Sequence, residues 1–549
     1  MTPKTLLFLF LTLFAGFHKS VAQTERPKLV VGIVVDQMRW DYLYRYENLY
    51  GNDGFKRLLH QGFNCQQTFI NYLPSFTAAG HAGIYTGSVP AFNGIVANDW
   101  FDRNSGRPWY CTEDTTVNAV GGSAKAGQMS PRNLLATTIT DELRLATNFR
   151  SKVIGISIKD RGAILPAGHT ANAAYWYDSQ TGNFMTSDYY RKDLPQWLMK
   201  FNQRNLPDSL MNQDWNTLLP LKAYTQSTTD DNLYEGHLEG TQKAVFPYRT
   251  SQLSEKDKKD DVRYTPYGNT LLRLLAEQCI RQEHLGSGNA TDFLALSFSA
   301  TDYAGHLFGP NAIETEDVYL RLDRELAQFL KFLDQTVGQG NYIVFLTADH
   351  GAAHNARFMQ DHHIPARSVS IKGIKHQLNQ YLLVKYQDSS LVQSLYNYQV
   401  FLNNKTIAAR KIDRQRLLND IQLWLQNQQG VTAVYNLENG DVSRAPKAIQ
   451  DMITNGYYRQ RCGSLQIILD PQWYSGYGQT GTTHGSWNPY DTHIPLIWYG
   501  WHIPAGETYE RTNMTDIAAT LAAMLHIQMP NACVGKVILP LLSSAPEEK

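Results

Sequence analysis

A short apolar run that ends in a charged pair places the strongest constraint on the fold of this chain. Residues 342–346 are apolar and lead directly into Thr347-Ala348-Asp349-His350-Gly351. Such a run, closed by a glycine, predicts a buried strand of a parallel sheet. Because open α/β sheets bind ligands beyond the carboxyl ends of their strands, Asp349 and His350 are expected at a functional edge. The alternative is a capping carboxylate beside a surface histidine.

Three further apolar runs end in polar residues. Residues 29–35 are followed by Asp36, residues 152–158 by Lys159-Asp160-Arg161, and residues 292–299 by a segment that contains Asp302 and His306. Asp302 and His306 are four residues apart, so one helical turn would place both within reach of one metal ion. Lys159 and Arg161 could clamp a phosphoryl group, although a solvated charged turn is the simpler interpretation of the pair in isolation.

A turn rich in small residues supplies a candidate nucleophile. In Leu73-Pro74-Ser75-Phe76-Thr77-Ala78-Ala79-Gly80-His81, the proline disfavours helix before itself and the small residues after Thr77 suit a helix. Thr77 is therefore predicted at a helix N-terminus, where free N–H groups and the helix dipole favour an anion. Its hydroxyl is either an N-cap or a nucleophile, and Ser75 is a rival on the same turn.

The rest of the chain predicts an α/β domain with inserted segments. Helices are expected over residues 55–60, 131–146, 267–282, 313–337, 414–425 and 515–525, and a last strand over 494–498. Residues 175–261 and 365–480 are interpreted as insertions that pack beside the main sheet or cover its site. Three histidines shortly after the Asp349-His350 pair are interpreted as ordinary loop residues: His354, His362 and His363.

The N-terminus predicts a signal peptide over residues 1–22. Lys4 precedes an apolar run at 6–17, and Ser20-Val21-Ala22 forms a small-x-small cleavage signal before Gln23. The run is too short to span a bilayer comfortably, and no later stretch is apolar enough. We therefore expect an exported, periplasmic protein without a membrane span, whose mature domain comprises residues 23–549.

The charge composition argues against nucleic acid as the main partner. The 549-residue chain carries 50 Lys plus Arg and 50 Asp plus Glu, without basic runs. Its 43% hydrophobic and 18% charged content is typical of a globular protein. The five cysteines form no CxxC pair, so a thiolate zinc site is not expected.

Six candidate metal ligands follow strand ends or lie in a flexible loop. They are Asp36, Asp302, His306, Asp349, His350 and, from the loop Gly481-Thr482-Thr483-His484-Gly485, His484. A catalytic zinc commonly keeps three protein ligands and one open position, so three Asp and three His divide into two such sites. Two ions about 3.5–4 Å apart can hold the attacking and leaving oxygens of a phosphoryl transfer.

Together these motifs resemble the alkaline phosphatase superfamily, and most closely its exported bacterial monoesterases of the PafA type. The resemblance rests on Asp36, the Thr77-Ala78-Ala79-Gly80-His81 turn, Asn98, Lys159-x-Arg161, Asp302-xxx-His306, Asp349-His350-Gly351 and Thr483-His484-Gly485. It covers the chain from Val30 to the C-terminal helix. It implies a mostly parallel central sheet flanked by helices, with the two insertions as cap segments.

The resemblance also implies the chemistry of a two-zinc phosphate monoesterase. One Zn²⁺ would be held by Asp302, His306 and His484, and the other by Asp36, Asp349 and His350, with Thr77 bridging to it. The second zinc would lower the pKa of the Thr77 hydroxyl, so that its alkoxide attacks phosphorus and a phosphothreonine forms. The phosphoryl oxygens would be bound by Asn98, Lys159 and Arg161. The expected substrates are small phosphate monoesters, and the expected state is a monomer.

Other functions remain open at this stage. A phosphodiesterase or nucleotide pyrophosphatase on the same scaffold would lack the Lys159/Arg161 pair. Two fixed cations bind the dianionic group of a monoester more strongly than the monoanionic group of a diester. A sulfatase is disfavoured because no Cys/Ser-x-Pro-x-Arg motif surrounds Thr77. A non-catalytic, metal-stabilised surface binding protein would have little need of Thr77.

Overall fold

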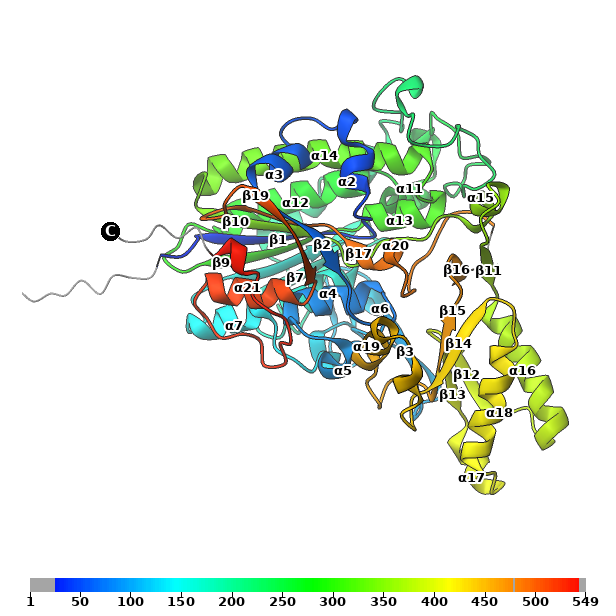
Figure 1. The fold of residues 1–549 in the computed structure, drawn as a ribbon. Helices are drawn as coiled ribbons and strands as arrows, with labels where there is room; N and C mark the ends of the chain where they lie inside the picture. Colours follow the sequence, from blue (N-terminus) through cyan, green and yellow to red (C-terminus); the bar gives the residue numbers. More distant parts are fainter. Residues whose placement is uncertain (1–24, 477–478, 543–549) are drawn as a thin grey trace, which may run out of the picture.

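One eleven-stranded sheet forms the centre of the molecule in the computed structural model, which describes residues 25–476 and 479–542 (Figure 1). Five neighbouring strands at its centre run parallel: β10 (Tyr342–Thr347), β1 (Leu29–Val35), β9 (Asp292–Phe298), β6 (Val153–Ser157) and β7 (Ala173–Asp178). Every residue of these five strands is buried. Burial on both faces explains why most of them appear as continuous apolar runs.

Other strands extend the sheet on both sides. Beyond β10 the order continues with β18 (Leu496–Gly500), β2 (Phe63–Phe69) and β17 (His493–Ile494), and β19 (Gly506–Asn513) also pairs with β2. Beyond β7 it continues with β8 (Asn183–Ser187) and β5 (Ala119–Val120). The strands β18 and β8 run antiparallel to the parallel centre. The predicted mostly parallel α/β fold is confirmed.

Helices cover both faces of this sheet. One face carries α3 (Phe55–Gln61), α12 (Tyr267–Glu283) and α14 (Ile313–Leu333), and the other carries α4 (Thr77–Thr86), α7 (Ile139–Ala146) and α21 (Asp516–Met524). The helix predicted over 131–146 is interrupted. Its first part is only a turn of 3-10 helix, Pro131–Asn133, and α7 begins after Thr138, whose side chain accepts a hydrogen bond from the Asp141 amide. This capping box begins a separate helix.

The first predicted insertion, residues 175–261, begins inside the main sheet. Its first residues belong to β7, which pairs in parallel with β6. The remainder contains β8 and short helices, including α9 (Gln196–Asn202), α10 (Leu206–Met211) and α11 (Glu255–Asp261). The sequence does not indicate β7 as a strand, because it consists of alanines, aromatic residues and an aspartate rather than of β-branched residues, and because the segment that follows it is polar.

The second predicted insertion, residues 365–480, contains a sheet of its own. Four strands pair in the order β12 (Val392–Tyr396), β13 (Gln399–Leu402), β15 (Leu465–Leu469) and β14 (Val431–Asn436). The helices α16 (Ile371–Tyr386) and α18 (Arg414–Gln426) pack on it around a separate apolar core. Strand β11 (Arg367–Val369) pairs with β16 (Trp473–Ser475), so the two ends of the segment leave the main domain side by side.

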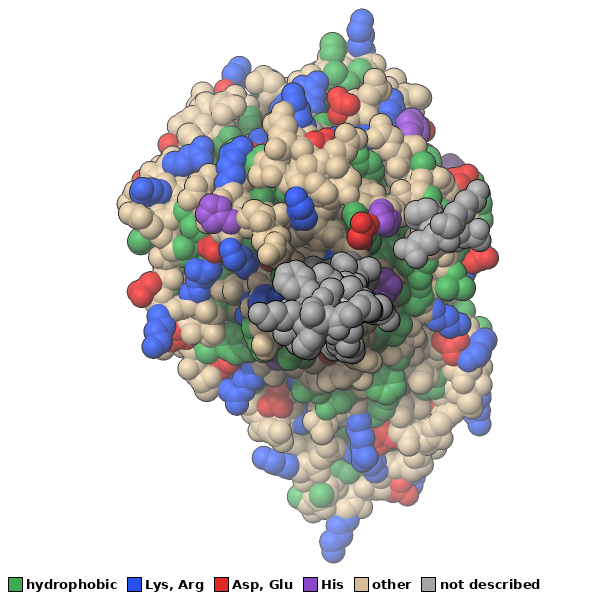
Figure 2. All heavy atoms as spheres, turned by 90° about the vertical axis from the view of Figure 1, so that its left-hand side faces the viewer, with side chains coloured by type: hydrophobic (Ala, Val, Ile, Leu, Met, Phe, Trp, Pro, Cys, Tyr) green, Lys and Arg blue, Asp and Glu red, His purple; other side chains and the backbone are tan. Residues whose placement is uncertain are grey.

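On the face shown in Figure 2, outside the grey atoms, Lys and Arg side chains are interspersed with Asp and Glu. None of the described helices has both the length and the hydrophobicity to cross a membrane. The predicted signal peptide lies outside the described residues.

Candidate metal and phosphoryl-transfer site

Three neighbouring strands bring the predicted carboxylates together. Strand β1 lies between β9 and β10, with Val35 beside Phe298 and Val34 beside Thr347. Asp36, Asp302 and Asp349 follow these strand ends, and all three side chains are buried. Asp302 lies in α13 (Ala300–Phe308), which also carries His306 one turn later. The carboxyl edge of the sheet therefore gathers residues that are more than 300 positions apart in the chain.

The three predicted histidines all present the same nitrogen to these carboxylates. The Nδ1 atoms of His306, His350 and His484 lie 2.8, 2.9 and 2.8 Å from the carbonyl oxygens of Thr482, Gly351 and Ser75. Because a carbonyl oxygen can only accept a hydrogen bond, each Nδ1 carries the proton. Each Nε2 therefore keeps its lone pair for a ligand, which is the arrangement of metal-binding histidines.

One group of possible metal ligands is made by Asp302, His306 and His484. One ligand atom from each lies within 4.8 Å of the others, and Asp302 Oδ1 is 3.2 Å from His306 Nε2 and 3.9 Å from His484 Nε2. Burial, together with the neighbouring His350 and His306, lowers the pKa of His484 well below its usual value. A neutral imidazole is the form that binds a metal ion.

A second group is made by Asp36, Asp302 and His350. The ring of His350 stacks on His484 with centroids 3.4 Å apart, so the two groups are adjacent. The resemblance implies Asp349 rather than Asp302 as the third member. The structure places Asp349 Oδ2 3.5 Å from His350 Nε2, with no hydrogen-bond partner among the described residues. Asp302 thus lies between the two groups, and Asp349 borders the second.

The electrostatics of these carboxylates favour a nearby cation. Burial and the nearby charges of Asp302 and Asp349 raise the pKa of Asp36 well above its usual value. Burial alone would also raise the pKa of Asp302, but His306 and Lys159 hold it well below its usual range. Asp36 Oδ1 and Asp349 Oδ2 have no hydrogen-bond partner among the described residues, and adjacent buried carboxylates of this kind are stabilised by positive charge. The donor set of carboxylate oxygens and imidazole nitrogens fits zinc and similar divalent ions.

Thr77 lies at the first position of α4, directly against the second group. Its Oγ1 is 3.3 Å from His350 Nε2, and its side chain is buried. A Cβ atom on Gly80 would come 2.5 Å from the carbonyl oxygen of Asp349, so this glycine lets α4 approach the turn that carries Asp349. The rival hydroxyl of Ser75 instead donates to the Ser486 carbonyl oxygen at 2.9 Å. Of the two hydroxyls, only that of Thr77 therefore lies against the second group.

The predicted phosphoryl-binding residues surround the same edge. Lys159 Nζ lies 2.6 Å from Asp36 Oδ2 and 2.5 Å from Asp302 Oδ2, while the other oxygens of both carboxylates face the histidines. Although burial opposes its charge, Asp302 and Asp36 raise the pKa of Lys159 to about 12. Arg161 donates to the Tyr110 hydroxyl at 3.0 Å. Asn98 Oδ1 accepts from the Ala78 amide at 2.9 Å, which leaves its Nδ2 group as the donor.

Two residues that support this site have no role assigned to them from the sequence. Gln37 donates from Nε2 to Asp302 Oδ1 at 2.7 Å and from its backbone amide to Asp349 Oδ1 at 3.1 Å. His81 Nδ1 lies 2.9 Å from the Thr77 carbonyl oxygen and 3.4 Å from Asp349 Oδ2. The i, i+4 spacing of Thr77 and His81 on a helix is a signal that could have indicated the second contact. The contacts of Gln37 have no sequence signal.

The other histidines of the region take no part in either group. His354 Nδ1 lies 3.1 Å from Asn311 Oδ1, and His362 Nδ1 contacts the Phe358 carbonyl oxygen at 2.8 Å. His363 is exposed and has a φ of 62° in the turn after α15 (Ala356–Asp361). All three histidines are loop or helix-end residues, as the sequence predicts.

Removing divalent cations is expected to destabilise the folded protein. Without a cation, the carboxylates of Asp36, Asp302 and Asp349 remain buried with Lys159 as their principal positive neighbour. When the concentration of a free ion is 1,000 times its Kd, binding of that ion contributes about 4 kcal/mol to the free energy of unfolding. A chelator should therefore lower the melting temperature measured by calorimetry, and added Zn²⁺ should restore it. In His306→Ala this sensitivity should be reduced, whereas His362→Ala should behave like the unaltered protein. Equal melting temperatures with and without chelator would contradict the metal site.

Comparisons with known proteins agree with this geometry. Residues 30–491 match the profile of the family described as type I phosphodiesterase / nucleotide pyrophosphatase. The chain is 46% identical to alkaline phosphatase PafA of Elizabethkingia meningoseptica over 99% of this chain and 100% of the relative. It is 50% identical to a Myroides odoratus protein named calcium-transporting ATPase, over 94% of each chain. The crystal structure of PafA superposes with a TM-score of 0.93 at 46% identity, covering 94% of this chain and 99% of that one.

The chain belongs to the type I phosphodiesterase / nucleotide pyrophosphatase family, and through it to the alkaline phosphatase superfamily. Within that superfamily it is an enzyme of the alkaline phosphatase kind, a phosphoric monoester hydrolase.

Proposed function

We propose that the protein hydrolyses small phosphate monoesters through a phosphothreonine intermediate on Thr77, at a site that binds two zinc ions. The observation that carries this proposal is the position of the Thr77 hydroxyl. It lies at the N-terminus of α4, 3.3 Å from His350 Nε2, beside two adjacent groups of metal-binding side chains. A buried hydroxyl beside such donors is well placed for nucleophilic catalysis.

The metal ions would be held by residues that are already oriented. One would be held by Asp302, His306 and His484, and the other by Asp36, Asp349 and His350, with Thr77 beside it. When bound, such ions act as Lewis acids that lower the pKa of a hydroxyl and stabilise negative charge on oxygen. Gln37 fixes Asp302 and Asp349 relative to each other, and His81 links Asp349 to α4.

The chain itself supplies the nucleophile and the binding of the phosphoryl group. Thr77 Oγ1 forms a bond to phosphorus while the bond from phosphorus to the alcohol oxygen breaks, and the proton that the Thr77 hydroxyl loses is balanced by the proton that the leaving alcohol gains. Water then attacks the same phosphorus, which releases phosphate and restores the threonine. The positive end of the α4 dipole, Asn98 Nδ2, and the cations of Lys159 and Arg161 can stabilise the charge of the phosphoryl oxygens during both steps.

Lys159 and Arg161 favour a monoesterase over the phosphodiesterase for which the family is named. Both residues lie at the start of α8 (Asp160–Ala167), where the helix dipole adds positive charge. A monoester presents two negative charges to them, whereas a diester presents one charge and a second substituent. We therefore propose weaker activity on diesters. ATP also ends in a phosphoryl group with two negative charges, so the same site could release phosphate from it.

A solved variant of PafA supports these assignments by residue type. It carries replacements of a threonine by serine and of an asparagine, a lysine and an arginine by alanine. That variant is 45% identical to this chain and superposes with a TM-score of 0.92. The four residue types occur in the same order, and at nearly the same spacing, as Thr77, Asn98, Lys159 and Arg161. This correspondence supports carrying the four positions over as one functional set.

The proposed function is tested by the rates of the purified protein on an aryl phosphate and on its methyl diester. With zinc present, the kcat/KM of the monoester should exceed that of the diester by at least about 100-fold, because two cations face its additional charge. A preference for the diester would favour the phosphodiesterase. Full metal occupancy with no turnover of either ester would favour a non-catalytic metal-stabilised binding protein.

We also propose that the protein is exported to the periplasm, works as a monomer, and consists of one catalytic domain over residues 23–549 with two inserted segments. Cell fractionation, light scattering and limited proteolysis test these three statements separately. A cytoplasmic pool of the full-length chain would contradict the first.

A further inference from the structure

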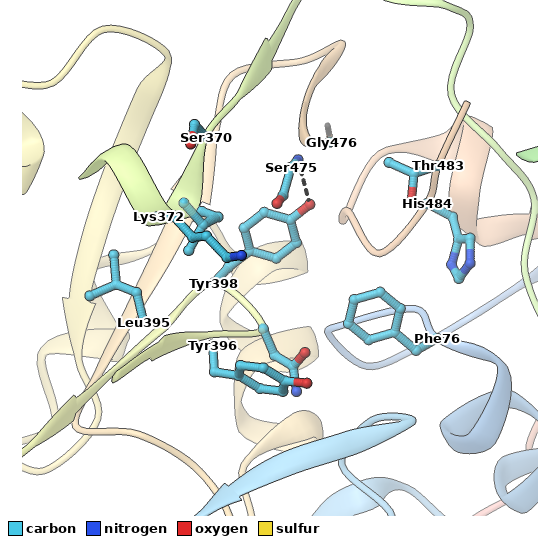
Figure 3. Close-up of a pocket in the computed structure, with 12 residues that line it drawn as sticks. Phe76, Ser370, Lys372, Leu395, Tyr396, Tyr398, Ser475, Gly476, Thr483 and His484 are labelled. Atoms are coloured by element: carbon cyan, nitrogen blue, oxygen red, sulfur yellow. Dashed lines mark hydrogen bonds between the residues drawn. The ribbon is translucent and has the colours of Figure 1, made fainter. Parts of the chain in front are cut away.

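A cavity of about 270 Å³ lies beside His484, between the edge of the main sheet and the second insertion (Figure 3). Its volume is close to the lower end, about 300 Å³, of pockets that hold small molecules. On one side it is lined by Phe76, Thr483 and His484, and on the other by Lys372, Leu395 and Tyr398. Two parts of the chain that fold around separate cores thus share one cavity.

The cavity continues directly from the proposed reaction site. Phe76 precedes Thr77, and its ring meets that of His484 edge-on with centroids 5.4 Å apart. In an in-line displacement, the attacking and leaving oxygens lie on opposite sides of phosphorus. Thr77 lies against His350, in the second group of donors, whereas His484 belongs to the first. The alcohol part of a monoester would therefore leave on the side of His484, where the cavity opens.

The far wall of the cavity is fixed by contacts with the main domain. The hairpin between β12 and β13 turns at Asn397 and Tyr398, whose φ angles of 51° and 60° are unusual for residues with side chains. Asn397 Nδ2 donates to the Asp99 carbonyl oxygen at 2.7 Å, and the Tyr396 hydroxyl bonds to the Asp99 carboxylate. The Tyr398 hydroxyl accepts from the Ser475 amide at 3.0 Å. Because Asp99 follows Asn98, the hairpin is held in register with the phosphoryl site.

The charge of the lining favours an anion. Helix α16 begins beside the cavity, where the side chain of Ser370 accepts from the Gly373 amide at 3.1 Å, and Lys372 lies in its first turn. In Figure 3 the Lys372 ammonium points toward the interior of the cavity. The dipole of a 16-residue helix adds positive charge at this end. None of the described residues that line the cavity is acidic. The rings of Phe76 and Tyr398 provide apolar contact for a flat group.

We propose that this cavity binds the alcohol part of the substrate and selects monoesters whose alcohol is a ring that carries a second anionic group, with Lys372 as the specificity residue. This inference rests on the proposed function and deepens it. The ring packs between Phe76 and Tyr398, and the anion meets Lys372 at the start of α16. The phosphoryl group is bound in the same way for every ester, so Lys372 affects the choice among alcohols.

The test compares phenyl phosphate with 4-carboxyphenyl phosphate. For each variant, the ratio of the two kcat/KM values is divided by the same ratio for the unaltered protein, which cancels the intrinsic reactivity of the two esters. In Lys372→Gln this relative preference for the carboxylated ester should fall by about tenfold, since a charge-assisted contact is lost. In Lys372→Glu it should fall further. Lys385→Ala removes the same charge at the other end of α16 and should leave the preference unchanged.

A binding measurement makes the result independent of turnover. Calorimetric titration of 4-carboxyphenylphosphonate and phenylphosphonate, which cannot be hydrolysed at the P–C bond by this route, should show the same loss of preference in Lys372→Gln. If the unaltered protein hydrolyses both esters and neither variant changes the preference, the cavity assignment is wrong and the proposed function stands. If the unaltered protein hydrolyses neither ester, the proposed function is wrong, and the phosphonate titrations alone decide whether Lys372 selects the anionic ring.

Discussion

Replacing Thr77 with alanine is expected to reduce the kcat of phosphate monoester hydrolysis by at least about 10⁴-fold, as loss of a covalent nucleophile does in other hydrolases. The fold should tolerate the change, because α4 is held by its packing and the Asn98 to Ala78 contact does not involve the Thr77 side chain. The measurement is steady-state release of phosphate. A second measurement is acid quenching after mixing with a ³²P-labelled ester, which should leave label on the unaltered chain and none on Thr77→Ala.

Two matched variants separate Thr77 from its neighbour. Thr77→Ser keeps a hydroxyl at the same place. It should retain most of the activity that Thr77→Ala loses, and it should also retain the acid-stable label. Ser75→Ala removes a hydroxyl that donates to the Ser486 carbonyl oxygen and should reduce kcat by less than about tenfold. Loss of the label in Ser75→Ala, with its retention in Thr77→Ala, would identify Ser75 as the nucleophile and reject the assignment made from the structure.

Much of the catalytic edge could be predicted because buried parallel strands have a strong sequence signature. The runs that become β1, β9 and β10 are mostly apolar, and the residues after such a run lie at the carboxyl edge of the sheet. Asp36, Asp302 and Asp349 could therefore be placed near one another from the sequence. His306 followed from helical spacing, and α13 provides that spacing.

Other parts of the site depend on contacts that no local pattern records. Strand β2 contains the buried polar residues Asn64 and Gln66, so it lacks the apolar signature of the central strands. The position of Lys159 between two carboxylates arises from the pairing of β6 with β9. That Asp302 lies within reach of both groups, while Asp349 borders the second, is likewise a matter of side-chain geometry within a few ångströms.

Replacing both Lys159 and Arg161 with alanine is expected to lower the kcat/KM of an aryl monoester by about 10³-fold and that of its methyl diester by no more than about tenfold. The loss of a single preorganised donor to a developing charge costs about 10²–10³-fold. The kcat/KM of the dianionic monoester should fall more than that of the diester, because both cations interact with the additional charge of the monoester. Arg161→Ala alone should show part of this selectivity, and it leaves the contacts of Lys159 with Asp36 and Asp302 in place.

The control for this double variant lies at the other end of the same strand. Arg150 and Lys152 have the same residue types and spacing as the catalytic pair, but they precede β6 instead of following it. Replacing both with alanine removes the same charge from the protein and should leave the ratio of monoester to diester rates unchanged. Metal content must be measured in each variant, because Lys159 contacts two proposed metal ligands. If the selectivity of Lys159→Ala/Arg161→Ala equals that of the control at full metal occupancy, the two cations do not bind the phosphoryl group.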